Sequence, residues 1–310
     1  MEMESILLKM EEYPKPIGEW SNEDADNFLK NIIKSTSANT IQLYIHLMRQ
    51  AHKFVCNIQG KNYVQLNPTH SLEDYVDLNM LRSVTLTEYE FNQVRKELKY
   101  VDNDTEGNYR DVALFELAWY GLSSEEIKFL KKDDIKETEK GIIIEIYKTK
   151  KGEKDKKEPT RVLNRSIIID DPEIVKDILM AKKENRYYKV RNYESKDLII
   201  VDEIYYIPSP YLIRGINNVK ADKLKERKDK PIAHIGMLMY KQLKKIQLPE
   251  INIDFEHLSV EDIRRSMLIN LILKEEIPIY SLKVMLNKKR DGDLIWLKSI
   301  TDKMVKAGLL

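Results

Sequence analysis

The stretch Leu258–Leu297 reads LSVEDIRRSMLINLILKEEIPIYSLKVMLNKKRDGDLIWL and carries the strongest structural signals in the chain. Ser259, followed three residues later by Asp262, forms a capping box, in which each side chain satisfies a free backbone N–H at the start of a helix. Apolar residues then recur at helical spacing until a proline ends the helix. Arg264 and Arg265 therefore lie near the start of this helix, where free N–H groups and the helix dipole favour an anion.

The composition indicates a folded, mostly helical protein with a heavily charged surface. The chain has 310 residues, which is enough for two domains of ordinary size. Hydrophobic residues make up 42% and charged residues 33%, while glycine and proline number only 10 each. The low glycine and proline content favours helix over sandwich folds or disordered tails. Because the net charge is only +1, a nucleic-acid surface would require segregated charge.

Several kinds of site are not expected from the sequence. The single cysteine, Cys56, permits no internal disulfide and cannot anchor a zinc cluster, and the five histidines are scattered. We therefore expect neither a metal site nor a cofactor. No apolar run reaches the ~18–20 residues of a membrane span, and the N-terminus lacks a signal-peptide pattern. A cytoplasmic protein without a membrane partner is the expectation.

Residues 1–66 are predicted to form a helical domain. Ser21 caps one helix whose apolar residues share a face, and a second helix opens within residues 37–40. The outward side of the second helix carries Arg49 and Lys53. Most such helices are simply packed helices, so this pattern alone does not indicate nucleic-acid binding.

An Asn-Pro pair then breaks the helical pattern, so residues 67–84 are predicted to be a linker and residues 85–310 a second domain. Within this domain, residues 110–135 predict a corner between two helices. The first helix is apolar and ends at Gly121, and the second is predicted to be capped by Ser124.

A β-hairpin is predicted next, from the β-branched strand 141–147 and a second strand at 161–169. The lysine-rich segment KTKKGEKDKKEP joins them and can be read either as a solvated loop or as a nucleic-acid contact. A helix is predicted at 172–183 and another at 235–246. Residues 184–235 between these helices give little readable pattern.

Two of these stretches resemble the signature of the tyrosine recombinases, or phage integrases. The family pattern L-t-p-H-x-L-R-H-T, followed by L-G-H and a tyrosine, matches the order of residues 258–297, with Arg264 at the second family arginine. The resemblance implies a mostly α fold with a small β-sheet. It also implies two domains, a helical core-binding arm and an α+β catalytic-like domain. The pattern G-L-R-x-S-E-L-x-x-L-x-x-x-D-I is matched in register by Gly121, Leu122, Glu126, Ile127, Leu130, Asp134 and Ile135.

The resemblance also indicates that the catalytic groups of the family are missing. Ser123 stands where the family has its first arginine, Glu261 and Lys288 where it has histidines, and Leu297 where it has the nucleophilic tyrosine. A recombinase needs two arginines for the phosphate oxygens, proton-transfer groups and that nucleophile. We therefore expect no catalytic residues and no enzymatic activity.

The remaining cations suit binding to DNA phosphates, which needs positive charge but no nucleophile. In the family, the hairpin tip enters the minor groove with a lysine, for which Lys148, Lys150 and Lys151 are equal candidates here. The predicted DNA-binding residues are Thr40, Arg49, Lys53, Lys148, Lys150, Lys151, Arg264, Arg265, Lys288, Lys289 and Arg290.

The favoured hypothesis is a sequence-specific double-stranded DNA-binding protein that acts as a transcriptional repressor at operator sites. The chain resembles the recombinase-fold lysogeny repressors of SPbeta-type temperate phages, which implies a prophage protein in the bacterial cytoplasm, on the nucleoid when bound. A regulatory protein or small effector acting on residues 184–235 stays open as a partner.

Two alternative functions are also compatible with the sequence. The first is an active or accessory integrase whose nucleophile comes from another subunit or from a displaced tyrosine such as Tyr240. The second is an inactive partner of a recombinase that docks or self-associates through the last helix. That helix has an apolar stripe formed by Leu294, Leu297, Ile300, Met304 and Leu309.

Overall fold

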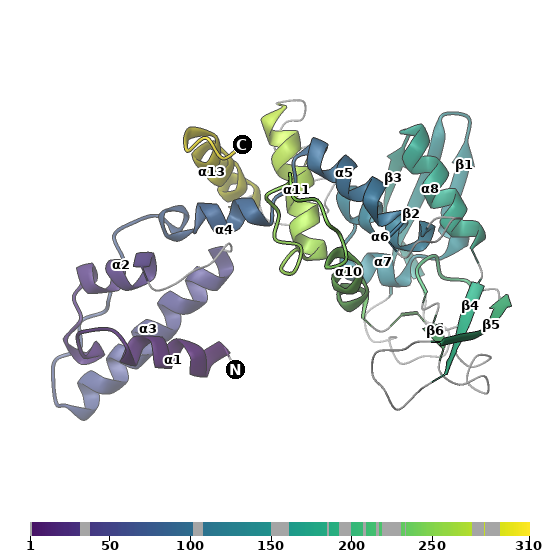
Figure 1. Cartoon of the computed structure of the whole chain (residues 1–310). Coiled ribbons are helices and arrows are strands. Elements are labelled where there is room, and N and C mark those ends of the chain that lie inside the picture. Colours follow the sequence, from purple (N-terminus) through teal and green to yellow (C-terminus); the bar gives the residue numbers. More distant parts are fainter. Residues whose placement is uncertain are drawn as a thin grey trace. The chain divides into compact units, whose positions relative to one another are not determined.

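The computed structural model is mostly helical with a small antiparallel sheet, as the sequence predicted. The chain divides into two compact units, one formed by Met1–Ser83 with Ile295–Leu310 and the other by Val84–Leu294 (Figure 1). The structure describes residues 2–31, 38–101, 108–149, 161–184, 186–191, 200–206, 209–214, 217–218, 231–232, 234–274, 282 and 292–310.

The first unit is built from helices around one apolar cluster. The ring centroids of Phe28 and Trp20 lie 5.0 Å apart. Ile300 and Met304 are completely buried in the same cluster. The predicted cap of the helix after Ser21 is confirmed, since Ser21 Oγ accepts a hydrogen bond from the Asp24 N–H at 3.2 Å. The helices are α1 (Glu2–Glu11), η1 (Ile17–Glu19), α2 (Asn22–Asn31), α3 (Ala38–Ile58), η2 (Leu72–Tyr75), α4 (Leu78–Ser83) and most of α13 (Gly292–Lys306).

This grouping differs from the predicted boundaries in two places. Residues 67–84, which the sequence suggested as a linker, include η2 and α4, and Tyr75 and Leu81 are buried in the cluster of the first unit. Residues 295–310, which were assigned to the domain 85–310, belong to the first unit because the apolar side of α13 packs into that same cluster.

The second unit combines helices with a three-stranded antiparallel sheet in the order β1-β2-β3. The predicted hairpin strands are confirmed, β1 was not predicted, and β4, β5 and β6 form another small sheet. The elements are α5 (Glu88–Leu98), α6 (Tyr109–Trp119), α7 (Ser124–Phe129), η3 (Lys132–Asp134), β1 (Ile135–Thr138), β2 (Gly141–Thr149), β3 (Arg161–Ile169), α8 (Pro172–Lys183), β4 (Arg186–Arg191), β5 (Ile200–Tyr206), β6 (Asn217–Asn218), α10 (Ile235–Leu243) and α11 (Val260–Leu273).

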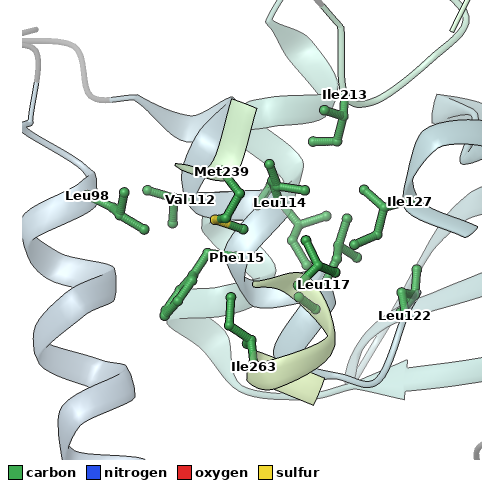
Figure 2. Packing of buried hydrophobic residues seen from close by; sticks show 14 of the residues in the cluster. Leu98, Val112, Leu114, Phe115, Leu117, Leu122, Ile127, Ile213, Met239 and Ile263 are labelled. Atoms are coloured by element: carbon green, nitrogen blue, oxygen red, sulfur yellow. The ribbon is translucent and has the colours of Figure 1, made fainter. Parts of the chain in front are cut away.

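Helix α6 runs through the middle of this unit and is buried on every side. Its residues 112–118 are all buried, as expected of a helix that is apolar all round. Figure 2 shows Phe115 among side chains from several elements, including Met239 of α10 and Ile263 of α11. Phe91 stacks on Phe115 with ring centroids 5.1 Å apart. The central helix therefore fixes the positions of the elements packed around it.

The register of the sheet decides which residues of β3 face this core. On β2, Ile142, Ile144 and Ile146 are buried and alternate with less buried residues, so they mark the inner face. Ile146 is paired with Arg165 of β3, and cross-strand partners point to the same face of a sheet. The register shifts directly after Ile146, which gives β3 one extra residue at a β-bulge.

A buried carboxylic acid on α6 makes stability sensitive to pH. Glu116 is 0% exposed, and neither of its oxygens has a hydrogen-bond partner in the described part of the chain. Arg95 lies beside it, with Nη1 3.7 Å from Glu116 Oε1. Burial, with a further contribution from the charge of Asp177, raises the pKa of Glu116 well above its ordinary value of 4.5. The folded protein therefore retains this proton at a pH where the unfolded chain has lost it.

We expect Glu116→Gln to remove part of the pH dependence of folding. The wild-type contribution is fully favourable below the unfolded pKa and is lost as pH rises towards the folded pKa. The variant should gain stability relative to wild type as pH rises, by about 1.4 kcal/mol for each pH unit above the unfolded pKa and up to the folded one, because glutamine has no proton to lose. Urea denaturation at pH 5 and pH 8 measures this. An equal difference between the two proteins at both pH values would contradict the assignment.

Candidate nucleic-acid interface

The helix predicted at the start of Leu258–Leu297 is confirmed as α11, and the predicted capping box is present at its first turn. Ser259 Oγ accepts a hydrogen bond from the Asp262 N–H at 3.3 Å, and the Asp262 carboxylate accepts one from the Ser259 N–H at 3.0 Å. This capping box fixes the first turn of the helix. It places Arg264 on the side of α11 that contacts the turn between α6 and α7.

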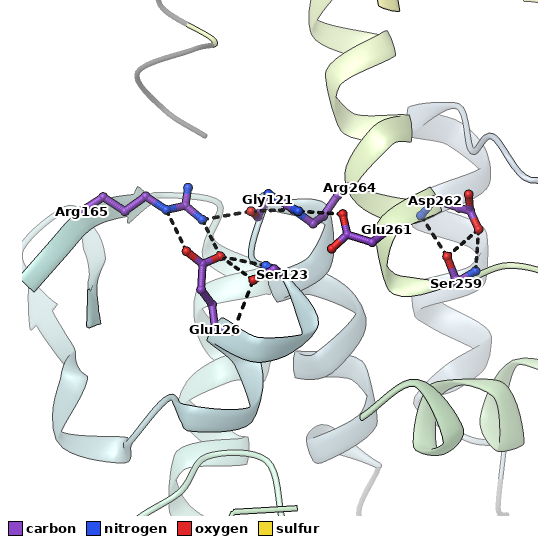
Figure 3. Close-up of polar contacts among 8 residues, drawn as sticks. All are labelled: Gly121, Ser123, Glu126, Arg165, Ser259, Glu261, Asp262 and Arg264. Carbon is purple, nitrogen blue, oxygen red and sulfur yellow. Dashed lines mark hydrogen bonds and ion pairs between the residues drawn. The ribbon is translucent and has the colours of Figure 1, made fainter. Parts of the chain in front are cut away.

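Arg264 is held by two acceptors. Its Nε donates to the Gly121 carbonyl oxygen at 2.9 Å, and its Nη1 lies 2.7 Å from Oε2 of Glu261, one turn earlier on α11 (Figure 3). The Arg264 side chain is only 12% exposed, whereas that of Glu261 is 62% exposed. The arginine is therefore fixed by the protein, and the carboxylate beside it is accessible to solvent.

The turn that offers this carbonyl requires a glycine, as the sequence predicted. Gly121 has a φ of 85°, in the left-handed region that disfavours a side chain. Its N–H donates to Ala118 O and the N–H of Leu122 donates to Leu117 O, both at 3.0 Å. This is the Schellman arrangement that ends a helix, here α6.

The prediction that Ser124 caps the next helix is wrong by one residue. Ser123 is the N-cap of α7, with Oγ accepting from the Glu126 N–H at 3.3 Å, while Glu126 Oε2 accepts from the Ser123 N–H at 2.9 Å. Either serine has the cap chemistry, but only Ser123 stands three residues before a glutamate that completes a capping box. The residue at the position of the first family arginine therefore has a structural role.

A second arginine, which the sequence analysis did not single out, reaches the same turn from the sheet. Arg165 of β3 donates from Nη2 to the Gly121 carbonyl at 3.0 Å and lies 2.9 Å from Glu126 Oε2. Burial alone would raise the pKa of Glu126, but the Ser123 N–H and the Arg165 guanidinium outweigh it and lower the pKa. Arg165 and Glu126 thus form a charged pair. In the sequence, Arg165 stands between Asn164 and Ser166 in the predicted strand, and no pattern singles it out.

Arg265 is paired within its own helix. Its Nη2 lies 2.5 Å from Asp262 Oδ1, and its side chain is 17% exposed. Burial lowers the pKa of the Arg265 guanidinium, partly offset by the Asp262 carboxylate. Contact between Arg265 and DNA stays a prediction.

The predicted residues of the hairpin and of the arm are only partly described. Lys148 is exposed near the end of β2, opposite Val162. In the first unit, Thr40 is half-buried, and the exposed Lys53 lies over the ring of Tyr63. Arg49 donates to Leu66 O at 2.7 Å and to Asn67 Oδ1 at 3.1 Å, so it fastens the segment that follows α3. The predictions for Lys150, Lys151, Lys288, Lys289 and Arg290 lie outside the described residues.

At the position of the family tyrosine, Leu297 of α13 is buried, and its carbonyl accepts a hydrogen bond from Thr301 Oγ1 at 2.8 Å. Among the described residues, no three histidine, cysteine, aspartate or glutamate side chains are grouped to hold a metal ion. None of the described helices is long and apolar enough to cross a membrane.

Comparison with known proteins gives matches among solved structures. No protein-family model and no curated protein matches the sequence. The chain is similar to the Tn1549 transposon integrase in complex with a circular intermediate DNA, at 15% identity and a TM-score of 0.46, over 95% of this chain and 87% of that one. It is similar to the XerH site-specific recombinase bound to a palindromic difH substrate, at 14% identity and a TM-score of 0.49, over 98% of this chain and 76% of that one. It is also similar to lambda integrase in a dimer bound to a COC' core site, at 10% identity and a TM-score of 0.48, over 96% of this chain and 87% of that one.

Proposed function

We propose that this chain is a catalytically inactive relative of the tyrosine recombinases that binds a defined duplex DNA site and represses transcription there. Binding requires cations placed along phosphates and side chains that reach base edges. Cleavage requires in addition a nucleophile and groups that move protons. The candidate interface retains cations that can contact phosphates. The positions expected to hold the nucleophile and the proton-transfer groups hold other residues.

The observation that carries this proposal is the arrangement around Arg264. This arginine matches the second family arginine and is fixed on the Gly121 carbonyl. The position of the first family arginine holds Ser123, which caps α7 and carries no charge to offer a phosphate. The position of the family histidine holds Glu261, whose carboxylate accepts from Arg264 and would repel a phosphate.

The energetic consequence for catalysis is large. Loss of one preorganised donor commonly reduces a rate by about 10²–10³-fold. Leu297, an aliphatic residue, cannot attack phosphorus, so the covalent route lacks its first step. Binding tolerates the same changes because it depends on the sum of many phosphate contacts.

A transcriptional repressor is the simplest role for a protein that binds one DNA site and leaves it intact. In this proposal the arm and the second unit both contact the operator, with the lysine-rich hairpin in the minor groove. The resemblance to SPbeta-type repressors suggests a prophage setting, in which the bound site controls lysogeny.

Selection of bound fragments from genomic DNA tests the binding proposal. We expect a small set of fragments that share one sequence and that bind in gel shifts at ~150 mM salt. The logarithm of the binding constant should fall with the logarithm of salt concentration, with a slope near −0.9 for each phosphate contacted. Recovery of random fragments without sequence preference at this salt concentration would rule out a repressor.

A further inference from the structure

Two arginines from different elements converge on one backbone oxygen in the second unit. Arg165 Nη2 and Arg264 Nε lie 3.0 Å and 2.9 Å from the Gly121 carbonyl oxygen, so the two guanidinium groups are neighbours (Figure 3). Two positive charges that share one acceptor repel each other, and the repulsion is stronger away from bulk water. Their side chains are only 9% and 12% exposed. The protein therefore holds two positive charges together at this turn.

Local strand geometry explains how Arg165 reaches the turn. Its partner across the sheet, Ile146, is buried on the inner face, so Arg165 points to the same face. The β-bulge next to this pair redirects the strand, as bulges commonly do beside functional sites. Arg165 is thus aimed at the α6–α7 turn by the backbone and does not depend on a flexible loop.

In the part of the chain that the structure describes, Arg165 is paired with Glu126 and Arg264 with Glu261, and the two carboxylates differ in how firmly they are held. Glu126 is 14% exposed and is tied to Ser123 through the α7 capping box. Glu261 is 62% exposed, and its side chain has Arg264 Nη1 as its hydrogen-bond partner among the described residues. If another monoanion took the place of the Glu261 carboxylate beside Arg264, each of the two arginines would still be paired with one negative charge. A DNA phosphodiester is such a monoanion.

We propose that Arg165 and Arg264 form a two-arginine site for one DNA phosphate, and that Glu261 occupies this site until DNA displaces it. Arg165 then supplies the second positive charge at a turn where the first family arginine is replaced by Ser123. The inference rests on the proposed DNA-binding function and adds to it a residue, Arg165, and an internal competitor, Glu261. Without DNA, Arg264 Nη1 donates to the Glu261 carboxylate. With DNA bound, the same Nη1 donates to the phosphate.

The first test removes the competitor. Glu261→Gln should tighten binding to a short duplex cut from a selected fragment by about tenfold, which is 1.4 kcal/mol. Glu256→Gln is the matched control, since Glu256 is exposed, lies in the same unit and undergoes the same change of charge. The control should change affinity by less than about twofold, as expected of an exposed charge. Equal effects from both substitutions would overturn the proposal.

The second test removes the second cation without leaving a buried charge unpaired. In the double variant Arg165→Gln/Glu126→Gln, both members of the pair become neutral, and glutamine still completes the α7 capping box. We expect about tenfold weaker binding and a salt slope reduced by about one, the value for one lost phosphate contact. Adding Glu261→Gln to this variant should restore much less than its gain in wild type, because the two arginines act on one phosphate.

The outcomes separate this inference from the proposed function. If wild type binds its site but the folded double variant binds equally well with the same salt slope, Arg165 is only a structural partner of Glu126 and the inference fails. Circular dichroism of the same samples establishes that the variant is folded. If wild type shows no site preference at all, the proposed function fails first.

Discussion

Replacement of Arg264 by glutamine is expected to weaken binding to the selected duplex by about 100-fold. The guanidinium provides charge-assisted hydrogen bonds with a fixed fork geometry, and removal of such a group from a desolvated contact commonly costs 2–5 kcal/mol. Arg264→Lys keeps the charge but loses the fork that reaches both Gly121 O and a second acceptor. We expect it to fall between wild type and the glutamine variant. Fluorescence anisotropy titration at fixed salt concentration gives the three dissociation constants.

Lys274 is the matched control for this experiment. It follows α11 directly, is 45% exposed and is paired with Glu88 at 2.6 Å. Lys274→Gln removes the same charge near the same helix, so it should weaken binding by less than about threefold if charge alone is lost at an exposed site. If Arg264→Gln had no larger effect than Lys274→Gln, α11 would not contact a phosphate through Arg264.

The second large effect is expected from Ile300→Ala in the last helix. Ile300 is completely buried in the cluster of the first unit, and truncation of a buried isoleucine typically costs 2–5 kcal/mol because it loses apolar burial and leaves a cavity. Ile295→Ala is the control, since Ile295 lies on the same helix and is 59% exposed. That change should cost less than about 0.5 kcal/mol. Urea denaturation gives both values.

The same experiment tests the alternative in which the last helix associates with another copy of the chain. Within one chain, the loss of stability from Ile300→Ala should be independent of protein concentration. If the helix were exchanged between subunits, the unfolding midpoint of wild type would rise with concentration, as expected when folding is coupled to association. A concentration-dependent midpoint would therefore contradict packing of α13 within its own chain.

Local signals predicted the helix starts and stops that position the candidate interface. The capping box of Ser259 and Asp262 and the left-handed Gly121 act within a few residues of sequence, so they are readable without a structure. The cap of α7 was misplaced at Ser124 because two adjacent serines both have the required chemistry. The deciding partner, Glu126, lies three residues after Ser123.

Contacts over long sequence distances were not predictable in the same way. Arg165 faces the core only because of its pairing with Ile146 and the β-bulge beside it, and neither feature has a clear signature in the sequence. The carbonyl of Gly121, which both arginines share, carries no side-chain information at all. The first unit includes α13 because Ile300 and Met304 complete an apolar cluster formed by the first 83 residues, which periodicity alone cannot reveal.

The central claim is that this chain binds a specific DNA site and does not cut it. The most direct measurement incubates wild type with a nicked suicide duplex carrying the selected sequence and divides the sample between a native gel and an SDS gel. We predict a shifted, sequence-dependent band on the native gel and free DNA alone on the SDS gel. A band of protein-linked DNA that survives SDS would contradict the claim, because only an active nucleophile produces a covalent adduct.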